Sequence, residues 1–263
     1  MDEYDLSVVA LEVLTKRFSG EFAVRPFIVR YPKWMMAQMN RWATSKSEHV
    51  RRLATEGCRS RLPWAMVLPV FKEDPSAVLP ILEKLKEDEN EYVRRSVANN
   101  LNDISKDNRD VVIEIARSWL GTSRETDRLV KHACRTLLKR GDAEVLGLFG
   151  YESPRHITLS NLVVGESVNW GDSLVFSFQL KTPKNRIGKL RIEYGIDFMK
   201  SNGRLSRTIF KISESDFPSR EKHVMRSHPF RPISTRKYYP GAHGIAIILN
   251  GEAVANGAFE LSM

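Results

Sequence analysis

The chain has 263 residues, 42% of them hydrophobic, which is enough for one large domain or two modest ones with buried cores. It has no run of the roughly 18–20 apolar residues that a membrane span requires, and its acidic, amphipathic start is unlike a secretory signal, so we expect a cytoplasmic protein. With 41 Lys and Arg against 32 Asp and Glu, the net charge is +9, which favours a polyanionic partner but does not establish one.

A helical motif recurs in the first part of the chain, from about residue 5 to residue 149. The stretches HVRRLATEG, YVRRSVANN and LVKHACRTL align at Val50, Val93 and Val130, which are 43 and 37 residues apart. This spacing approximates the roughly 40–47-residue period of HEAT and armadillo helix pairs. A candidate partner helix precedes each copy, at residues 33–43, 76–86 and 108–120. The pattern predicts a superhelix of three stacked HEAT-like helix pairs.

Candidate capping boxes precede the three repeated helices. In such a box a side-chain oxygen and a glutamate satisfy backbone N–H groups that the first helical turn leaves unpaired. The predicted boxes are Ser45 with Glu48, Asp88 with Glu91, and Thr122 with Glu125.

Helical spacing separates an apolar face from a polar one in each repeat. In the second copy, Val93 and Val97 begin an apolar stripe, whereas Arg95, Asn99 and Asp103 form a polar row at i, i+4 and i+8. Stacking places equivalent rows side by side, which predicts a basic, concave surface. We expect this surface to carry Arg52, Arg95, Lys131, His132 and Arg135.

The second part of the chain, from about residue 155 to residue 263, has the period-two alternation of half-buried strands. The stretches SLVFSFQL, KLRIEYGIDF, LSRTIFKIS and HGIAIIL show it, and Asn-Gly and Pro-Gly turns separate them. About six or seven short strands predict an immunoglobulin-like β-sandwich. We therefore predict a multidomain α plus β protein, with a HEAT-like repeat domain at 1–150 and a sandwich at 155–263.

Four stretches resemble a known family. TKRFSGEFAVRPFI, HVRRLATEGCRSRLPW, YVRRSVANNLNDISKD and VKHACRTLLKRG are similar to the AlkC-type branch of bacterial DNA alkylation-repair glycosylases. The resemblance covers about residues 10–150, and an immunoglobulin-like domain after the helices is a known arrangement in that branch. It implies excision of N3-alkylated bases, especially 3-methyladenine and 3-methylcytosine, in base excision repair. It also implies double-stranded alkylated DNA as the partner, a monomer, and capture without flipping the base into a pocket.

The chemistry that this resemblance implies requires acidic side chains but no cofactor and no metal. An N3-methylated base is already cationic and leaves as a neutral molecule, so the developing charge is an oxocarbenium ion on the sugar. A fixed carboxylate beside C1′ stabilises that charge and positions water. We expect Glu56 and Asp103 to be catalytic. The alternatives are a pair between Arg52 and Glu56, a pair between Arg95 and Asp103, or an exposed helix end.

Aromatic and amide side chains are candidates for substrate contacts. Trp64, Trp119 and Asn99 are the predicted substrate-binding residues, because an aromatic face can hold a cationic base or a deoxyribose. We expect Trp64 to begin a helix. Core packing is the alternative for both rings and is favoured for Trp119, while Trp34 and Trp42 are expected to be core residues of their helix.

Eight basic residues are candidate DNA contacts, and a solvated surface is the alternative for each of them. They are Arg52, Arg59, Arg61, Arg94, Arg95, Lys131, His132 and Arg135. A second hypothesis of another class is a catalytically silent HEAT-repeat scaffold that binds DNA or protein.

Cys58 and Cys134 are the only cysteines. Two isolated thiols make neither a disulfide framework nor a metal site, so we expect both to be small apolar packing residues.

Overall fold

The computed structural model describes residues 3–232 and 236–263 and divides into two compact units, Met1–Leu137 and Leu138–Met263. Residues 138–150, which the sequence analysis assigned to the helical domain, therefore cluster with the strands. Within the described residues, no helix has the length and apolar character needed to cross a bilayer.

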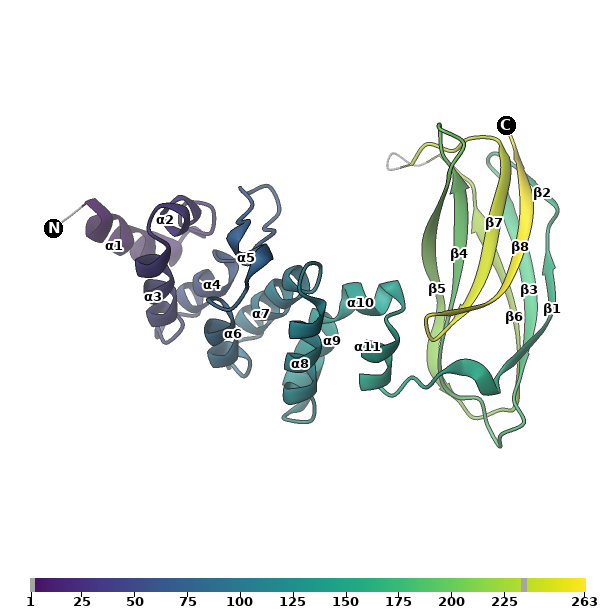
Figure 1. The fold of residues 1–263 in the computed structure, drawn as a ribbon, viewed down its shortest axis with the longest axis horizontal. Helices are drawn as coiled ribbons and strands as arrows, with labels where there is room; N and C mark the ends of the chain where they lie inside the picture. Colours follow the sequence, from purple (N-terminus) through teal and green to yellow (C-terminus); the bar gives the residue numbers. More distant parts are fainter. Residues whose placement is uncertain (1–2, 233–235) are drawn as a thin grey trace. The chain divides into compact units, whose positions relative to one another are not determined.

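The first unit is a stack of helices (Figure 1). The elements are α1 (Glu3–Thr15), α2 (Arg25–Arg30), α3 (Pro32–Trp42), α4 (Glu48–Glu56), α5 (Val70–Glu73), α6 (Leu79–Leu85), α7 (Glu91–Ile104), α8 (Arg109–Trp119), α9 (Arg124–Ala133) and α10 (Arg135–Arg140), which crosses the unit boundary. The repeated motifs form α4, α7 and α9, and α3, α6 and α8 are their partner helices. Helix α4 packs on α7 and α7 packs on α9, which confirms the predicted stack of HEAT-like pairs.

The aligned valines hold this stack together. Val50, Val93 and Val130 are at most 1% exposed, as are Val97 and Leu101 along the stripe of α7. Complete burial of an aliphatic side chain contributes about 1.5–3 kcal/mol, so the repeated apolar positions supply the driving force for stacking.

The predicted capping residues Ser45, Asp88 and Thr122 lie one or two residues before the true N-caps. The N-caps of the three repeated helices are Ser47, Asn90 and Ser123. The Asn90 side chain accepts from the backbone N–H of Tyr92, while the carboxylate of Asp88 binds Arg51 at 2.6 Å. The Asp88 carboxylate therefore joins a long-range ion pair, and its local hydrogen bond is with the N–H of the N-cap residue Asn90, at 2.9 Å, instead of with the first helical turn.

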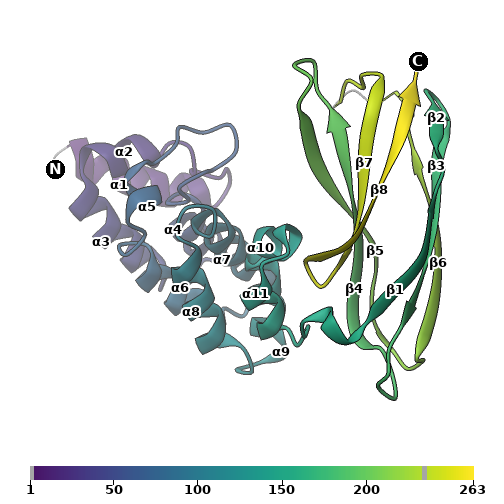
Figure 2. The same ribbon diagram turned by 45° about the vertical axis from the view of Figure 1, so that its right-hand side comes forward.

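The second unit is a β-sandwich preceded by short helices (Figure 2). The elements are α11 (Ala143–Leu148), η1 (Pro154–His156), β1 (Thr158–Val164), β2 (Ser167–Asn169), β3 (Ser173–Lys181), β4 (Gly188–Met199), β5 (Leu205–Phe217), β6 (Glu221–Pro229), β7 (Gly241–Leu249) and β8 (Glu252–Ser262). One sheet has the order β1-β3-β6 and the other has the order β2-β8-β7-β4-β5. Their inner faces share one hydrophobic core, which confirms the predicted immunoglobulin-like sandwich.

An aromatic cluster in this core surrounds a buried histidine. The Nδ1 atom of His228 lies 2.9 Å from the Tyr194 hydroxyl, and its ring packs 4.6 Å from that of Phe210. Burial, together with the nearby charge of Arg236, lowers the pKa of His228 to about 4. The imidazole is therefore neutral in the folded protein near neutral pH.

We predict that His228 makes the sandwich sensitive to acid. An unfolded histidine has a pKa of about 6.5, so protonation favours the unfolded chain. The contribution of neutral His228 to stability is present above about pH 6.5 and is lost as the pH falls towards 4. The substitution His228→Phe should reduce the fall in melting temperature between pH 7 and pH 5 by several degrees, as measured by circular dichroism.

The control is His223→Phe on the same strand, because the His223 side chain is exposed and should leave the pH dependence unchanged. An equal acid sensitivity in the His228→Phe protein and the wild type would show that this histidine is not the source.

Candidate active site

The two predicted catalytic carboxylates lie together. Glu56 is the last residue of α4 and Asp103 lies near the end of α7, and the two side chains are 5% and 2% exposed. The guanidinium of Arg59 bridges them. Its Nη1 donates to Glu56 Oε1 at 2.5 Å, and its Nε donates to Asp103 Oδ2 at 2.8 Å. One planar cation thus holds both acidic groups in one place.

The remaining carboxylate oxygens also have donors. Ser96 Oγ donates to Glu56 Oε2 at 2.6 Å, and Lys106 Nζ donates to Asp103 Oδ1 at 2.8 Å. Arg52 lies at a longer distance, 3.7 Å from Glu56 Oε1, so the pair considered as an alternative is present but secondary. The partners of Asp103 are Arg59 and Lys106, which corrects both alternatives for Asp103, a pair with Arg95 and an exposed helix end.

Helix α7 also fixes the end of α4 that carries Glu56. The Nδ2 group of the fully buried Asn100 donates to the backbone carbonyl of Thr55 at 2.8 Å. The same amide lies 3.5 Å from the sulfur of Cys58. Burial raises the pKa of Cys58 to about 12, so this residue is a packed thiol and not a nucleophile.

Trp64 does not begin a helix as predicted. It lies at the tip of the loop between α4 and α5, with a φ of 61° and a side chain that is 98% exposed. Positive φ is incompatible with a right-handed helix. Backbone carbonyls in this loop bind Arg25 and the N–H of Leu68, instead of forming the bonds of a helix. The structure nevertheless leaves the Trp64 ring free to contact a ligand.

The other tryptophans divide differently from the prediction. Trp119 is 3% exposed, and its Nε1 donates to Glu83 at 2.8 Å, so its predicted contact with substrate is corrected to core packing. It lies on the face of α8 that packs on the rest of the stack. Trp42 is buried as expected, whereas Trp34 is 62% exposed and is not a core residue.

The polar row of α7 meets α9 through Asn99. Its Oδ1 accepts a hydrogen bond from Arg135 at 3.0 Å and lies 3.1 Å from Nε2 of His132. Burial, with the charges of Arg135 and Arg95, lowers the pKa of His132. His132 is therefore a neutral imidazole near neutral pH, and the positive charge of this row comes from its arginines. Asn99 itself is half-buried, and its side-chain oxygen is in contact with His132 and Arg135.

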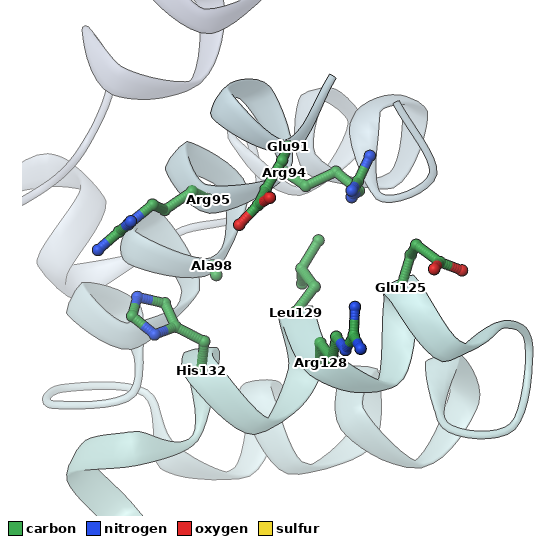
Figure 3. Close-up of a pocket in the computed structure, with 8 residues that line it drawn as sticks. All are labelled: Glu91, Arg94, Arg95, Ala98, Glu125, Arg128, Leu129 and His132. Atoms are coloured by element: carbon green, nitrogen blue, oxygen red, sulfur yellow. The ribbon is translucent and has the colours of Figure 1, made fainter. Parts of the chain in front are cut away.

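A hollow of about 340 Å³ lies between α7 and α9, beside this row (Figure 3). Arg95 and His132 lie at one end of it, and Arg94 and Arg128 lie towards the other. It is lined by Glu91, Arg94, Arg95, Ala98, Glu125, Arg128, Leu129 and His132. The sequence analysis did not include Arg128, although its position one turn before His132 on α9 was a sufficient signal.

Several candidate phosphate contacts have partners within the protein. Arg59 is occupied by the two carboxylates and is 7% exposed, so we correct its predicted role in phosphate binding. Arg52 pairs with Glu21 at 2.5 Å, and Arg61 pairs with Asp107 at 2.7 Å.

The other candidates lie on α7 and α9. Arg94 donates to the backbone carbonyl of Asp88 at 2.6 Å. Arg95 and Lys131 are exposed, and Arg135 is half-buried.

Sequence reasoning missed three residues that shape the site: Ser96, Lys106 and Arg25. Ser96 is one residue from the polar row of α7, so its contact with Glu56 requires the packed helices to be known. Arg25 stands within an otherwise apolar stretch, AVRPFI, and that contrast was an available signal. In the described ranges, no three His, Cys, Asp or Glu side chains are arranged to hold a metal ion.

Comparison with known proteins identifies one family model for each unit. The model described as "DNA alkylation repair enzyme" matches residues 19–137, and that described as "Uncharacterised protein YhaZ, C-terminal Ig-like domain" matches residues 158–263. YhaZ of Bacillus subtilis (strain 168) is 47% identical over 260 residues, which are 98% of this chain and 72% of the relative. A solved structure of the Pseudomonas fluorescens alkylpurine DNA glycosylase AlkC, bound to DNA containing an abasic site analog, has a TM-score of 0.92 at 35% identity. It covers 100% of this chain and 74% of that chain.

We predict that Arg59 is essential to the stability of the helical unit. Its removal by Arg59→Met leaves two buried carboxylates without their shared cation, which should lower the free energy of unfolding by about 3–5 kcal/mol. Urea denaturation followed by circular dichroism at a helical wavelength measures this loss.

The control is Arg61→Met, which breaks the half-exposed pair with Asp107 and should cost about 0–1 kcal/mol. Similar losses in the two variants would mean that the bridge between Glu56 and Asp103 contributes no more than a surface ion pair.

Proposed function

The chain belongs to the DNA alkylation repair enzyme family, and from this premise we propose that it is a DNA glycosylase that releases N3-alkylated bases from double-stranded DNA. The proposed reaction is hydrolysis of the N-glycosidic bond, with 3-methyladenine and 3-methylcytosine as the expected bases. One observation carries this proposal. The family's helical stack holds two buried carboxylates, Glu56 and Asp103, on one guanidinium beside a row of basic side chains.

The proposed chemistry uses these carboxylates as fixed negative charges. As the bond between C1′ and the base nitrogen breaks, its electron pair moves to the cationic base, which leaves neutral. The sugar becomes an oxocarbenium ion, and burial of Glu56 and Asp103 strengthens their stabilisation of it because the local dielectric is low. A water oxygen then bonds to C1′ and gives its proton to a carboxylate. No general acid is needed, because the leaving group already carries the charge.

The network around the carboxylates supports this use. Arg59, Ser96 and Lys106 supply a donor to each oxygen, and Asp103 Oδ2 lies 2.8 Å from both Nε and Nη2 of Arg59, while a carboxylate oxygen accepts about two hydrogen bonds. Each group therefore retains capacity to bind water while its orientation is fixed. Preorganisation of this kind avoids the cost of reorienting dipoles during the reaction.

We propose that DNA lies along a row of basic residues, Arg95, Lys131 and Arg135, which we call the basic row. These side chains would contact phosphates, because they occupy adjacent turns of α7, α9 and α10. The exposed ring of Trp64 would contact the damaged base or its deoxyribose. The AlkC relative, which was solved with DNA containing an abasic site analog, supports binding of the product of base release.

A catalytically silent scaffold is the second candidate. The observation that favours it is the complete pairing of the Glu56 and Asp103 oxygens, which is also found in purely structural ion networks. Such a protein would bind DNA without releasing a base.

We predict that Glu56→Gln and Asp103→Asn each lower the single-turnover rate of base release by about 10²–10³-fold, because each removes a charge that stabilises the oxocarbenium ion. Affinity for DNA should remain within a few-fold of wild type. The assay uses duplex DNA treated with a methylating agent, and mass spectrometry identifies the released base. Glu83→Gln is the matched control, because Glu83 contacts Trp119 and Lys86 and lies outside the site.

Two results would contradict the proposal in different ways. Wild-type rates in both variants would show that these carboxylates are not catalytic. A wild-type protein that binds methylated duplex but releases no base would establish the scaffold.

We also predict that the basic row sets the salt dependence of DNA binding. Arg95→Gln and Lys131→Gln should each reduce the slope of log K against log salt by about one, since each phosphate contact releases about one counterion. Fluorescence anisotropy with a labelled duplex measures the slope. Trp64→Ala should weaken binding but leave the slope unchanged, because it removes no charge. An unchanged slope in both charge variants would exclude this surface as the phosphate contact.

A further inference from the structure

Arg25 is the most unusual charged residue of the helical unit. It is the first residue of α2 and is 0% exposed. Every hydrogen bond that its guanidinium makes with the described residues ends on a backbone carbonyl, and none ends on a carboxylate. Burial lowers the pKa of Arg25, so its charge is held there at a cost. An apolar side chain of similar size would avoid that cost, so the guanidinium must have a role that an apolar group cannot fill.

The carbonyls that Arg25 binds belong to the two ends of one loop. Its Nη1 donates to the carbonyls of Gly57 and Arg59 at 2.9 Å each, and its Nε donates to that of Met66 at 2.8 Å. The Leu68 N–H donates to the Ser60 carbonyl at 3.1 Å and closes the loop beside this fork. Residues 57–66 are therefore fastened at both ends by one rigid group.

We propose that Arg25 is a positioning residue, which fastens the loop 57–66 so that Arg59 and Trp64 keep the places that the reaction requires. This inference rests on the proposed glycosylase function. Arg25 binds the backbone of Arg59, whose side chain bridges Glu56 and Asp103, so direct contacts connect Arg25 to both carboxylates.

The state of Trp64 is the second observation that supports this role. A bulky residue with a φ of 61° is strained by about 1–3 kcal/mol, and a ring that is 98% exposed gains nothing from packing. Such a conformation persists only where the surrounding structure imposes it. The fork of Arg25 imposes it from both sides, and the result is an aromatic ring presented to solvent on the same loop as Arg59.

Only arginine meets the geometry. A guanidinium offers five N–H groups in one plane, whereas a lysine ammonium is a compact charge that cannot span three carbonyls in the same way. The start of the loop is also packed closely against Val24, the residue before α2. A Cβ at Gly57 would lie 2.6 Å from Cγ1 of Val24, so this end has little freedom to move without displacing α2.

The test separates positioning from stability by comparing Arg25→Lys with Arg51→Lys. Arg51 is also buried, and its guanidinium likewise donates to backbone carbonyls, those of Ser45 and Lys46, but at the opposite end of α4 and away from the loop. Melting temperature, affinity for methylated duplex and the single-turnover rate of base release are measured for both. Arg25→Lys should lower the rate at least about tenfold, with affinity lowered no more than by Trp64→Ala, because the reacting groups move while the phosphate contacts remain. Arg51→Lys should lower the melting temperature without a comparable loss of rate.

A double variant that combines Arg25→Lys with Trp64→Ala tests whether Arg25 affects the reaction through the loop 57–66. If Arg25 acts through this loop, the double variant should be little slower than the slower single variant, whereas Arg51→Lys and Trp64→Ala should have independent effects. Gly57→Ala is the second variant, because it displaces the same loop end without removing a charge and should also lower the rate more than the affinity. Gly57→Ala replaces Arg25→Lys in the test if the Arg25→Lys protein does not fold.

Four outcomes are decisive, three for the positioning role and one for the proposed function. A rate loss in Arg25→Lys no larger than that in Arg51→Lys would overturn the positioning role, and so would independent effects of Arg25→Lys and Trp64→Ala. If neither Arg25→Lys nor Gly57→Ala folds while Arg51→Lys does, Arg25 is a structural residue and the inference fails. A wild-type protein that releases no base contradicts the proposed function itself, before any variant is compared.

Discussion

The carboxylates of Glu56 on α4 and Asp103 on α7 are buried side by side, and the helical unit is stable only if their charges are compensated. Glu56 and Asp103 would repel each other and lose their hydration if they stood alone, and the penalty is several kcal/mol for each ion. Arg59 removes both problems with one planar group. The packing of α4 on α7 brings the two carboxylates within reach of that group, so the repeat stack and the acidic centre depend on each other.

The architecture was predictable because it follows from periodicity, which is a local property. The spacing between Val50, Val93 and Val130 predicts stacked helix pairs, and those valines are buried in the stack that α4, α7 and α9 form. The alternation in the second half likewise predicts the sandwich. The helix starts were less predictable, because Asp88 pairs with a distant residue, Arg51, while Asn90 caps the helix. A pattern of neighbouring residues carries no information about such partners.

The same distinction explains which parts of the site could be predicted. The positions of Glu56 and Asp103 follow from helical rows, and the structure brings them together. The environments of Arg59 and Trp64 do not follow from rows, whereas the burial of Trp119 agrees with the core packing that its helix pattern favoured. Arg59 lies on a loop and turns inward to the carboxylates, and the loop that carries Trp64 is held by carbonyl contacts with Arg25, more than thirty positions earlier. Each outcome depends on tertiary contacts that the sequence does not encode locally.

The neutral state of His132 has a consequence for how the basic row responds to its surroundings. Burial and the neighbouring guanidinium groups lower the pKa of this imidazole, so it gains a proton only at a lower pH than an exposed histidine would. Arginine side chains remain protonated at either pH. The positive charge of the row therefore depends less on pH than it would with an exposed histidine in this place.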